Sequence, residues 1–473
     1  MPTAERQGAV MARARLVAGM TIDGFRLEER LHQGGMAAIW RVTRDGLALP
    51  AVMKTPFLDQ KGNLSQLVGF EVEQKIMARV TGEHVPRLIA NGDYTRQPYI
   101  VMEWIEGPTL KDIMAGVMMP IEDVVTKGAA IAIALGDLHR QHVLHLDLKP
   151  ANILFRGSGA AVIVDFGLSR HELLPDLYKE HDRKPAGTTA YMAPEQFLGI
   201  RSDRRSDIFA LGAILYQMAT GVQPFGAPKR VGAVRRRVWR DPVPPLKRRP
   251  DIPPALQEVI LKCIEPIPER RYATAEDLAF DLHNLDIVEL TERSARTDRT
   301  DLATAFDRLV RSRALLREIR DSARKPPPRA AIVLVAVDLR PGLERMRDAL
   351  LDAAVSVLAN MPGARLACLN VMQTSIVPSG NVDAAGDNIH VDRLARLRDW
   401  AAPLQLPEDK VTFHLLEAGS IAAGVVDFAR SNAVDHVVVG VPGGATASRL
   451  TMQITSQSPC SVTVVRGGEP QSG

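Results

Sequence analysis

The sequence contains few cysteines and lacks a long uninterrupted apolar segment. Its three cysteines, Cys263, Cys368 and Cys460, are far apart and form no C-x-x-C pair. This scarcity argues against a disulfide framework or a zinc site and fits a reducing compartment. No stretch is long and uncharged enough to cross a bilayer, and residues 1–20 are basic without the apolar centre of a signal peptide. We therefore expect a cytoplasmic protein with no membrane partner.

A strong net charge is also absent. The formal charge of +4 is small for 473 residues and unlike that of a dedicated nucleic-acid binder, so we expect no nucleic-acid partner. Hydrophobic residues make up 46% of the chain, enough to bury folded cores. A chain of this length exceeds one ordinary core, which predicts more than one domain.

The pattern of apolar residues divides the chain into parts. Short strand patterns come first, helical patterns follow, and apolar strands then alternate with amphipathic helices. Such alternation is typical of an α/β doubly wound parallel sheet covered on both faces. We predict a basic tail at 1–20, a two-lobed α+β domain at 21–290 with its lobes at 21–105 and 106–290, a charged linker at 291–328 and an α/β domain at 329–473.

The linker contains an arginine-rich segment with helical spacing that ends at "PPPR". Leu302, Leu309 and Leu316 recur at intervals of seven residues, which would suit the seam of a homodimeric coiled coil. Packing of this short apolar stripe on its own domain is the interpretation we favour. A homodimer through this helix or through the C-terminal domain stays open.

The stretch "VLHLDLKPANILF" carries polar side chains at fixed intervals inside an apolar frame. It places Asp147, Lys149 and Asn152 together, and Asp165 follows in "VDFG" at the end of an apolar strand. Transfer of a phosphoryl group needs a carboxylate to orient the attacking hydroxyl, a cation near the phosphate and oxygen ligands for Mg²⁺. These four residues supply those chemical types, so the pattern predicts a phosphoryl-transfer site.

With these motifs the chain resembles the protein-kinase family from about residue 22 to 285, and within it the bacterial eukaryotic-like Ser/Thr kinases. The resemblance implies a two-lobed kinase fold, ATP and Mg²⁺ as cofactors, and protein substrates with Ser or Thr acceptors. It also implies that Asp147 is the catalytic base, that Lys149 contacts the γ-phosphate, and that Asn152 and Asp165 are the metal ligands.

The same resemblance assigns residues to the nucleotide. Lys54 of "PAVMK" would contact phosphates and pair with Glu73, with Glu71 as the alternative partner. The segment "PYIVMEWI" resembles the hinge that binds adenine. The remaining nucleotide-binding residues are expected to be Leu31, Gly34, Gly35 and Ile39 around the glycine turn, and the Glu103 carbonyl and Ile105 amide of the hinge.

The glycine turn departs from the family pattern. In "HQGGMAAIW", His32 and Ala37 stand where the family has glycine, and only Gly34 matches. Glycine lets backbone amides approach phosphate closely, so these replacements predict a stiffer lid and weaker ATP binding. The alternative to an active kinase is therefore a pseudokinase, a scaffold for signalling with weak nucleotide binding.

The residue before the catalytic aspartate is Leu146, where many kinases have an arginine whose charge must be neutralised by a phosphorylated activation loop. No Ser or Thr lies between Ser169 and Thr188. The chain thus lacks both a Ser or Thr in the loop that could be phosphorylated and the arginine that would bind its phosphate. We therefore predict a kinase that activation-loop phosphorylation does not gate. The resemblance further implies that Glu195 of "APEQ" pairs with Arg271, and that Asp207 braces the catalytic loop.

The C-terminal part resembles the universal stress protein family in "IVLVAVDL", "DHVVVGVPGG" and "SPCSVTVV". In nucleotide-binding members the matching positions of Asp338, Gly440 and Gly443 hold the nucleotide. The phosphate loop departs from that pattern, because Gln453 and Ile454 replace the expected glycine and hydroxyl residue and the segment is short. A stress-linked regulatory domain that binds a partner or dimerises is favoured, and adenine-nucleotide binding is the alternative.

Overall fold

The structure is a computed structural model in which the chain forms two compact units. One comprises residues 68–88 and 103–328, and the other comprises residues 1–67, 89–102 and 329–473. The residues that the structure describes are 16–33, 37–57, 64–94, 97–181, 187–226, 236–298, 310, 312–323, 330–373, 388–441 and 445–466.

A six-stranded sheet forms the N-terminal region, in the order β1-β2-β3-β4-β6-β5. The pairs β1–β2, β2–β3 and β3–β4 are antiparallel, and register shifts interrupt the β2–β3 ladder before the glycine turn. Alternate side chains such as Leu27, Trp40 and Met53 are buried in one core. The strands are β1 (Thr21–Ile22), β2 (Phe25–Gln33), β3 (Ala37–Thr43), β4 (Ala51–Pro56), β5 (Leu88–Gly92) and β6 (Tyr99–Glu103).

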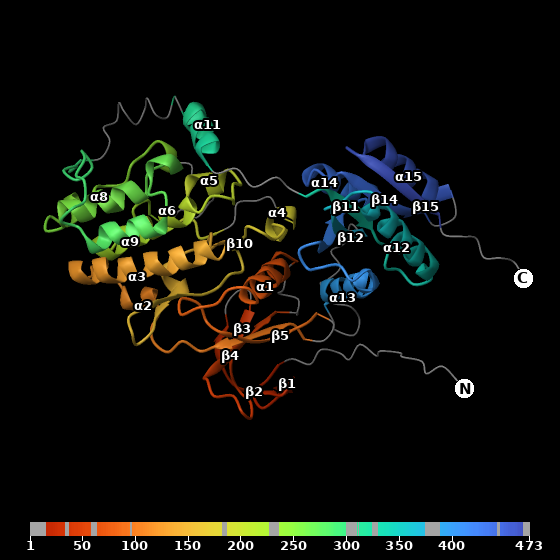
Figure 1. Ribbon diagram of the computed structural model, residues 1–473, viewed down its shortest axis with the longest axis horizontal. Helices are drawn as coiled ribbons and strands as arrows, with labels where there is room; N and C mark the ends of the chain where they lie inside the picture. Colours follow the sequence, from red (N-terminus) through yellow and green to blue (C-terminus); the bar gives the residue numbers. More distant parts are fainter. Residues whose placement is uncertain are drawn as a thin grey trace, which may run out of the picture. The chain divides into compact units, whose positions relative to one another are not determined.

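The larger unit is mainly helical (Figure 1). α6 is buried on nearly every side, packs on α3 and α8, and ends at Gly221, whose left-handed φ of 74° closes the helix. Its helices are α2 (Leu110–Ile113), α3 (Ile121–Arg140), α4 (Leu177–His181), α5 (Pro194–Phe197), α6 (Arg205–Thr220), α7 (Pro245–Arg248), α8 (Pro254–Cys263), η3 (Pro268–Arg270) and α9 (Ala275–His283); α1 (Leu64–Met77) precedes them.

Short strands frame the loop that carries the phosphoryl-transfer motif. The pair β7 (Val143–Leu144) and β10 (Arg170–His171) lies on one side of it, and β8 (Ile153–Phe155) and β9 (Ala161–Ile163) form an antiparallel ladder on the other. The turn η1 (Pro150–Asn152) links the loop to β8. Both strand pairs are largely buried, so they hold the ends of the loop in fixed positions.

The described part of the predicted linker contains the helix α11 (Ser312–Ser322). Its Ile319 is fully buried in a cluster with Val238 and Ile267, and Leu315 and Leu316 pack against the same cluster. These side chains therefore cover the helical unit of their own chain. Leu302 and Leu309 of the possible dimer seam, and the "PPPR" segment, lie outside the described residues.

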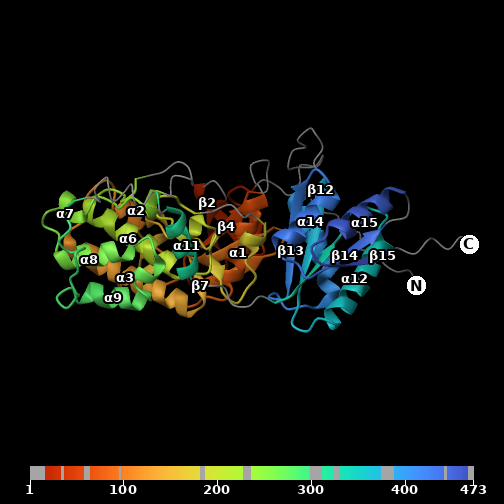
Figure 2. The same cartoon turned by 90° about the horizontal axis from the view of Figure 1, so that it is seen from above.

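The C-terminal domain is built on a parallel five-stranded sheet in the order β13-β12-β11-β14-β15 (Figure 2). The strands are buried apolar runs, as expected for a sheet covered on both faces. The elements are β11 (Ile332–Ala336), α12 (Glu344–Ala359), β12 (Arg365–Gln373), α13 (Ile389–Ala401), η4 (Ala402–Leu404), β13 (Val411–Ala418), α14 (Ile421–Ser431), β14 (His436–Val441), α15 (Ala445–Gln457) and β15 (Ser461–Arg466).

Successive strand residues of this sheet point to opposite cores. Leu334 and Val437 pack with α14 and α15, whereas Val335 and Val438 pack with α12 and α13. The strand order changes direction between β11 and β14, which is where doubly wound sheets hold ligands. The predicted α/β class is thus confirmed, although helix α15 was not anticipated from the sequence.

Within the described ranges, no helix is long and apolar enough to span a membrane.

Candidate active site

Asp147 lies in the loop after β7, and both oxygens of its carboxylate have fixed partners. Lys149 Nζ donates to Oδ2 at 2.6 Å, and the backbone N–H of Thr188 donates to Oδ1 at 2.5 Å. The residue is only 8% exposed, so few other orientations are open to the carboxylate. The structure therefore brings Asp147 and Lys149 together, as expected, and adds the Thr188 amide, which no sequence motif had indicated.

A backbone hydrogen bond holds the two expected metal ligands, Asn152 and Asp165, near each other. The N–H of Val164, the residue before Asp165, donates to the Asn152 carbonyl at 3.0 Å. Asn152 Nδ2 donates to the Asp147 carbonyl at 3.2 Å, so its Oδ1 is the atom left to bind a cation. Carboxylate and amide oxygens suit Mg²⁺, which protein sites of this kind hold with one or two carboxylates and substrate phosphates.

Among the residues that the structure describes, no group of three His, Cys, Asp or Glu side chains could hold a metal ion by itself.

The first turn of α6 stabilises the loop that carries Asp147. The Asp207 carboxylate accepts hydrogen bonds from the amides of His145 at 2.8 Å and Leu146 at 2.7 Å, and His139 Nε2 lies 3.0 Å from it. Gln196 donates to the Leu146 carbonyl at 2.7 Å. These bonds hold Leu146 at a φ of +62°, outside the usual range of a leucine. The Leu146 side chain itself is buried.

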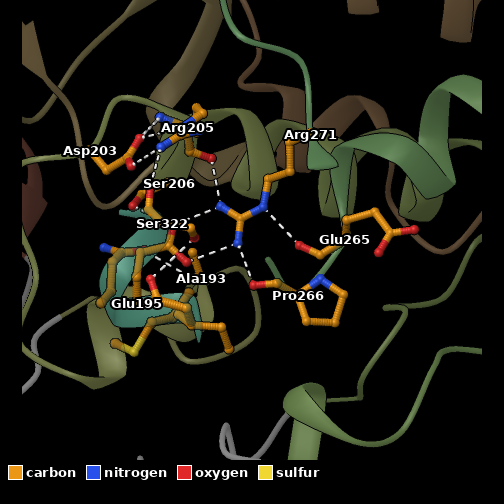
Figure 3. A network of polar contacts seen from close by, with 12 residues as sticks. Ala193, Glu195, Asp203, Arg205, Ser206, Glu265, Pro266, Arg271 and Ser322 are labelled. Carbon is orange, nitrogen blue, oxygen red and sulfur yellow. Dashed lines mark hydrogen bonds and ion pairs between the residues drawn. The ribbon is translucent and has the colours of Figure 1, made fainter. Parts of the chain in front are cut away.

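A buried ion pair anchors the segment that follows Thr188 (Figure 3). Arg271 binds the Glu195 carboxylate in a bidentate manner, at 2.6 and 2.8 Å, and both side chains are 0% exposed. The remaining guanidinium donors bind the carbonyls of Arg205, Glu265 and Pro266. Ser206 Oγ donates to Glu195 at 2.7 Å. The pair is thus fully hydrogen-bonded, as a buried ion pair must be to be tolerated.

Three of the residues expected to bind the nucleotide lie on adjacent strands of the N-terminal sheet. Leu31 is on β2, Ile39 is on β3, and Lys54 is opposite Ile39 on β4. Glu73 is buried in α1, where an ionised carboxylate needs a positive or hydrogen-bonding partner. Gly34 and Gly35 of the glycine turn lie outside the described residues.

The expected hinge is fixed by an ion pair at Glu103. Arg156 donates to both Glu103 oxygens at 2.6 and 3.0 Å, and the backbone N–H of Arg87 donates to one of them at 3.2 Å. The hydrogen bonds from Arg156 lower the pKa of Glu103 and outweigh the opposite effect of burial. Ile105 is buried two residues further along. The side chain of Glu103 therefore has a structural partner, and its carbonyl is the group expected at adenine.

The activation segment is held by an acidic residue of its own. The Asp176 carboxylate accepts hydrogen bonds from Arg201 Nε at 3.1 and 3.3 Å, and Arg201 also donates to the carbonyls of Leu168 at 2.9 Å and Ser169 at 3.4 Å. Arg170 lies 4.0 Å from the same carboxylate. Arg201 thereby ties the middle of the segment to the residues that follow Asp165-Phe166-Gly167. Sequence reasoning missed this pair, because 25 residues separate its members.

In the C-terminal domain, Asp338 follows β11 at the change in strand direction. Its carboxylate binds the Arg340 side chain at 2.5 to 3.1 Å and the Arg340 N–H at 3.0 Å. Burial alone would raise the pKa of Asp338, but its hydrogen bonds with Arg340 outweigh burial and lower it. A Cβ on Gly440 would lie 2.6 Å from Met346 Sδ, so that backbone is closely covered. Gly443 lies outside the described residues.

Residues 25–281 match the model of the protein kinase domain, and residues 331–466 match the universal stress protein family. The serine/threonine-protein kinase PknB of Mycolicibacterium smegmatis is 32% identical over 268 residues, covering 55% of this chain and 42% of the relative. PknB of Mycobacterium tuberculosis is 31% identical over 294 residues, covering 60% and 46%.

Among solved structures, the Mycobacterium tuberculosis PknI kinase domain matches with 21% sequence identity and a TM-score of 0.46, covering 57% of this chain and 100% of that one. The chain spans less than half the length of the two PknB relatives it matches. The kinase model covers more than half of the sequence, and the expected resemblance is confirmed. The chain therefore belongs to the protein kinase domain family and carries a universal stress protein domain at its C-terminal end.

Proposed function

We propose that the protein is an ATP-dependent serine/threonine protein kinase. The observation that carries this proposal is the immobilised Asp147 carboxylate, held by Lys149 and by the Thr188 amide above a loop braced by Asp207. A carboxylate fixed in this way can accept a hydrogen bond from a substrate hydroxyl and orient its oxygen for attack. The named Ser/Thr kinases among its relatives support the same acceptor class.

The other residues of the site have roles that follow from their chemistry. Lys149 would place its charge beside the transferred phosphoryl group while holding Asp147 in position. Mg²⁺, when bound, would neutralise phosphate charge, and Asn152 and Asp165 would hold it. Lys54 would bind the phosphates and pair with Glu73, and the hinge at Glu103 and Ile105 would bind adenine, with Leu31 and Ile39 against the nucleotide.

Incubation of the purified chain with labelled ATP, Mg²⁺ and a generic basic protein tests this proposal. We expect phosphate on Ser and Thr residues of the acceptor, identified by mass spectrometry, and none when the Asp147→Asn chain replaces the natural one. Failure of the natural chain to transfer phosphate under these conditions would instead favour the scaffold function.

We further propose that activation-loop phosphorylation does not gate the kinase, because Asp176 takes the place of a phosphate. Its carboxylate supplies a permanent negative charge to Arg201, and both side chains are largely buried, with 12% and 9% exposure. The pairing of a loop anion with arginine is the contact that phosphorylation creates in regulated kinases. Ser169, at the start of the loop, is buried and donates to the His145 carbonyl at 2.9 Å.

The Asp176→Asn chain is expected to lose about tenfold in kcat/KM for protein substrate, which corresponds to one charge-assisted hydrogen bond. Tyr178→Phe is the matched control. It removes the one hydroxyl between Ser169 and Thr188 but keeps the ring that lies 5.0 Å from the Arg201 guanidinium. We expect full activity for this control and for phosphatase-treated protein. Loss of activity on phosphatase treatment would contradict the proposal.

For the C-terminal domain we propose a regulatory or interaction role. The engagement of Asp338 by Arg340 supports this choice, because a nucleotide at that position would have to displace the arginine. Nucleotide binding at Asp338, Gly440 and Gly443 remains the second possibility. Dimerisation through this domain or α11 belongs to the same proposal, and size measurement of the full chain at several concentrations tests it.

The Arg340→Gln substitution is expected to raise the Asp338 pKa. A carboxylate with a lowered pKa in the folded state contributes stability above its unfolded pKa, and this contribution is lost as the pH falls through the lowered value. Without Arg340 this contribution should therefore be smaller, and Asp338 in the folded protein should become protonated at higher pH. Carboxyl ¹³C NMR titration of selectively labelled protein measures the shift, and Arg345→Gln, at an exposed position of α12, is the control. An unchanged Asp338 titration would show that Arg340 does not hold it.

A further inference from the structure

A buried arginine contacts the segment between Thr188 and α5. Arg237 donates through Nη1 to the Met192 carbonyl, and through Nη2 to the carbonyls of Thr189 and Ala190, the last at 3.0 Å. The side chain is 2% exposed. These three carbonyls belong to one short segment, Thr189–Met192, which directly follows Thr188, the residue whose N–H binds the Asp147 carboxylate. This position beside the proposed catalytic base would let the segment dock the protein substrate, and we call Thr189–Met192 the docking segment.

The surroundings of Arg237 fix its guanidinium without a carboxylate. Phe209 and Phe225 stack on each other with centroids 5.9 Å apart, and the guanidinium carbon lies 5.9 and 4.9 Å from their rings. No ion pair to Arg237 is present within the described part of the chain. Burial lowers its pKa to about 9, so the side chain stays charged at neutral pH. A buried arginine without an acidic partner lowers the stability of the fold. Its contacts to the docking segment therefore point to a role in positioning that segment.

The residues directly after Arg237 belong to the contact surface of α11. Val238 is buried with Ile267 and Ile319, and Trp239, Leu198, Leu315 and Leu316 pack around them. Leu198 directly follows α5, so the cluster also reaches the helix that comes after the docking segment. Arg237 thus contacts the docking segment, and the next residue, Val238, contacts α11.

Polar contacts fix α11 in this position. Arg205 donates to the Ser322 carbonyl at 2.7 Å, at the C-terminal end of the helix, while the same side chain binds Asp203. Arg270 and Glu318 form an ion pair at 3.0 Å. A cation at the last carbonyls of a helix is favourable, because the helix dipole is negative there. Along the chain, α11 is the last described element before the universal stress protein domain.

We propose that Arg237 is a positioning residue of the substrate-docking segment and that α11 holds it in place through Val238. This inference rests on the proposed kinase function. The segment that leads to the C-terminal domain would thereby set how well the kinase binds its protein substrate. Loosening of α11, by any event in that domain, would free the turn around Arg237 and the carbonyls it holds.

Kinetics of the full chain test the proposal. Replacing Arg237 by methionine, which has similar length but no donors, is expected to raise KM for an acceptor peptide about tenfold, the equivalent of one charge-assisted hydrogen bond, and to leave KM for ATP unchanged. Arg237→Lys should restore part of the loss, because a single ammonium reaches fewer carbonyls. Equal changes in both KM values, or none in the peptide KM, would overturn the proposal.

The role of α11 is tested separately. Ile319→Ala removes buried contacts of α11 and should raise the peptide KM in the same direction, whereas Arg320→Ala, at an exposed position of the same helix, should not. If both residues act through one turn, the double variant Arg237→Met, Ile319→Ala should show less than the product of the two single effects. Fully multiplicative effects would show that α11 and Arg237 act independently.

Hydrogen exchange distinguishes failure of this inference from failure of the kinase proposal. The amides of residues 188–193 should exchange faster in Arg237→Met and Ile319→Ala than in the natural chain or in Arg320→Ala. This readout needs no activity, so it decides the inference even if the natural chain transfers no phosphate. Unchanged exchange in both variants would overturn it.

Discussion

The Asp147→Asn protein is expected to transfer phosphate roughly 10²–10⁴ times more slowly than the natural chain, the range typical for removal of a general base. The amide keeps the shape of the carboxylate and an oxygen that accepts from Lys149 or Thr188, but it lacks the negative charge that orients and polarises a hydroxyl. ATP binding should persist, because the residue lies on the acceptor side of the proposed mechanism. Initial rates of labelled phosphate incorporation measure the effect.

The control for this substitution is Asp286→Asn, the same chemical change at an exposed position of the same unit. Its rate should equal that of the natural chain. Melting curves of both variants should overlap, since Asp147 is a small part of the loop's hydrogen bonding and Asp207 remains in place. A fully active Asp147→Asn protein would remove Asp147 from the catalytic role and contradict the proposed mechanism.

The Arg271→Met protein is expected to lose about 3–5 kcal/mol of stability in the helical unit, because Glu195 would remain buried without its partner. A loss of that size lowers the melting temperature of a unit of about this length by about 6–20 °C. Calorimetry or a dye-based thermal scan of the full chain measures it. Peptide phosphorylation should fall as well, since Glu195 anchors α5, which comes directly after the docking segment.

Two further variants make this prediction specific. Arg270→Met alters the neighbouring residue, whose ion pair with Glu318 is largely exposed, and should change stability by less than about 1 kcal/mol. The double variant Glu195→Leu, Arg271→Met removes both charges and should recover part of the stability, because no unpaired buried charge is left. A stable Arg271→Met protein would show that other donors satisfy Glu195.

The grouping of the predicted phosphoryl-transfer residues could be read from the sequence alone because their contacts are local. Asp147, Lys149 and Asn152 are separated by at most five residues, and hydrogen bonds within that stretch fix their geometry. The same reason explains the C-terminal sheet, where each strand is an apolar run and each helix has one apolar face. Helix α15 was missed because its polar composition resembles a loop.

Other features of the site could not be read from the order of residues. The sequence "RRRVWR" contains four arginines, and nothing in their spacing distinguishes Arg237, which is buried against a segment 45 residues earlier. Asp176 is one of several acidic residues of its loop, and only folding selects it as the partner of Arg201. The apolar stripe of the linker indicated a helix, yet it left open whether the helix would pack on its own chain.

The family and the two kinds of fold could be predicted from the sequence alone, because motif spacing and apolar periodicity are properties of neighbouring residues. The roles of the phosphoryl-transfer residues stay a prediction. Which buried polar groups meet depends on the tertiary structure. It places Arg205 against the Ser322 carbonyl, 117 residues away, and Arg201 against Asp176, 25 residues away. Such pairs depend on how helices pack, and burial then makes each pairing specific, since a charge in the interior is tolerated only beside suitable partners.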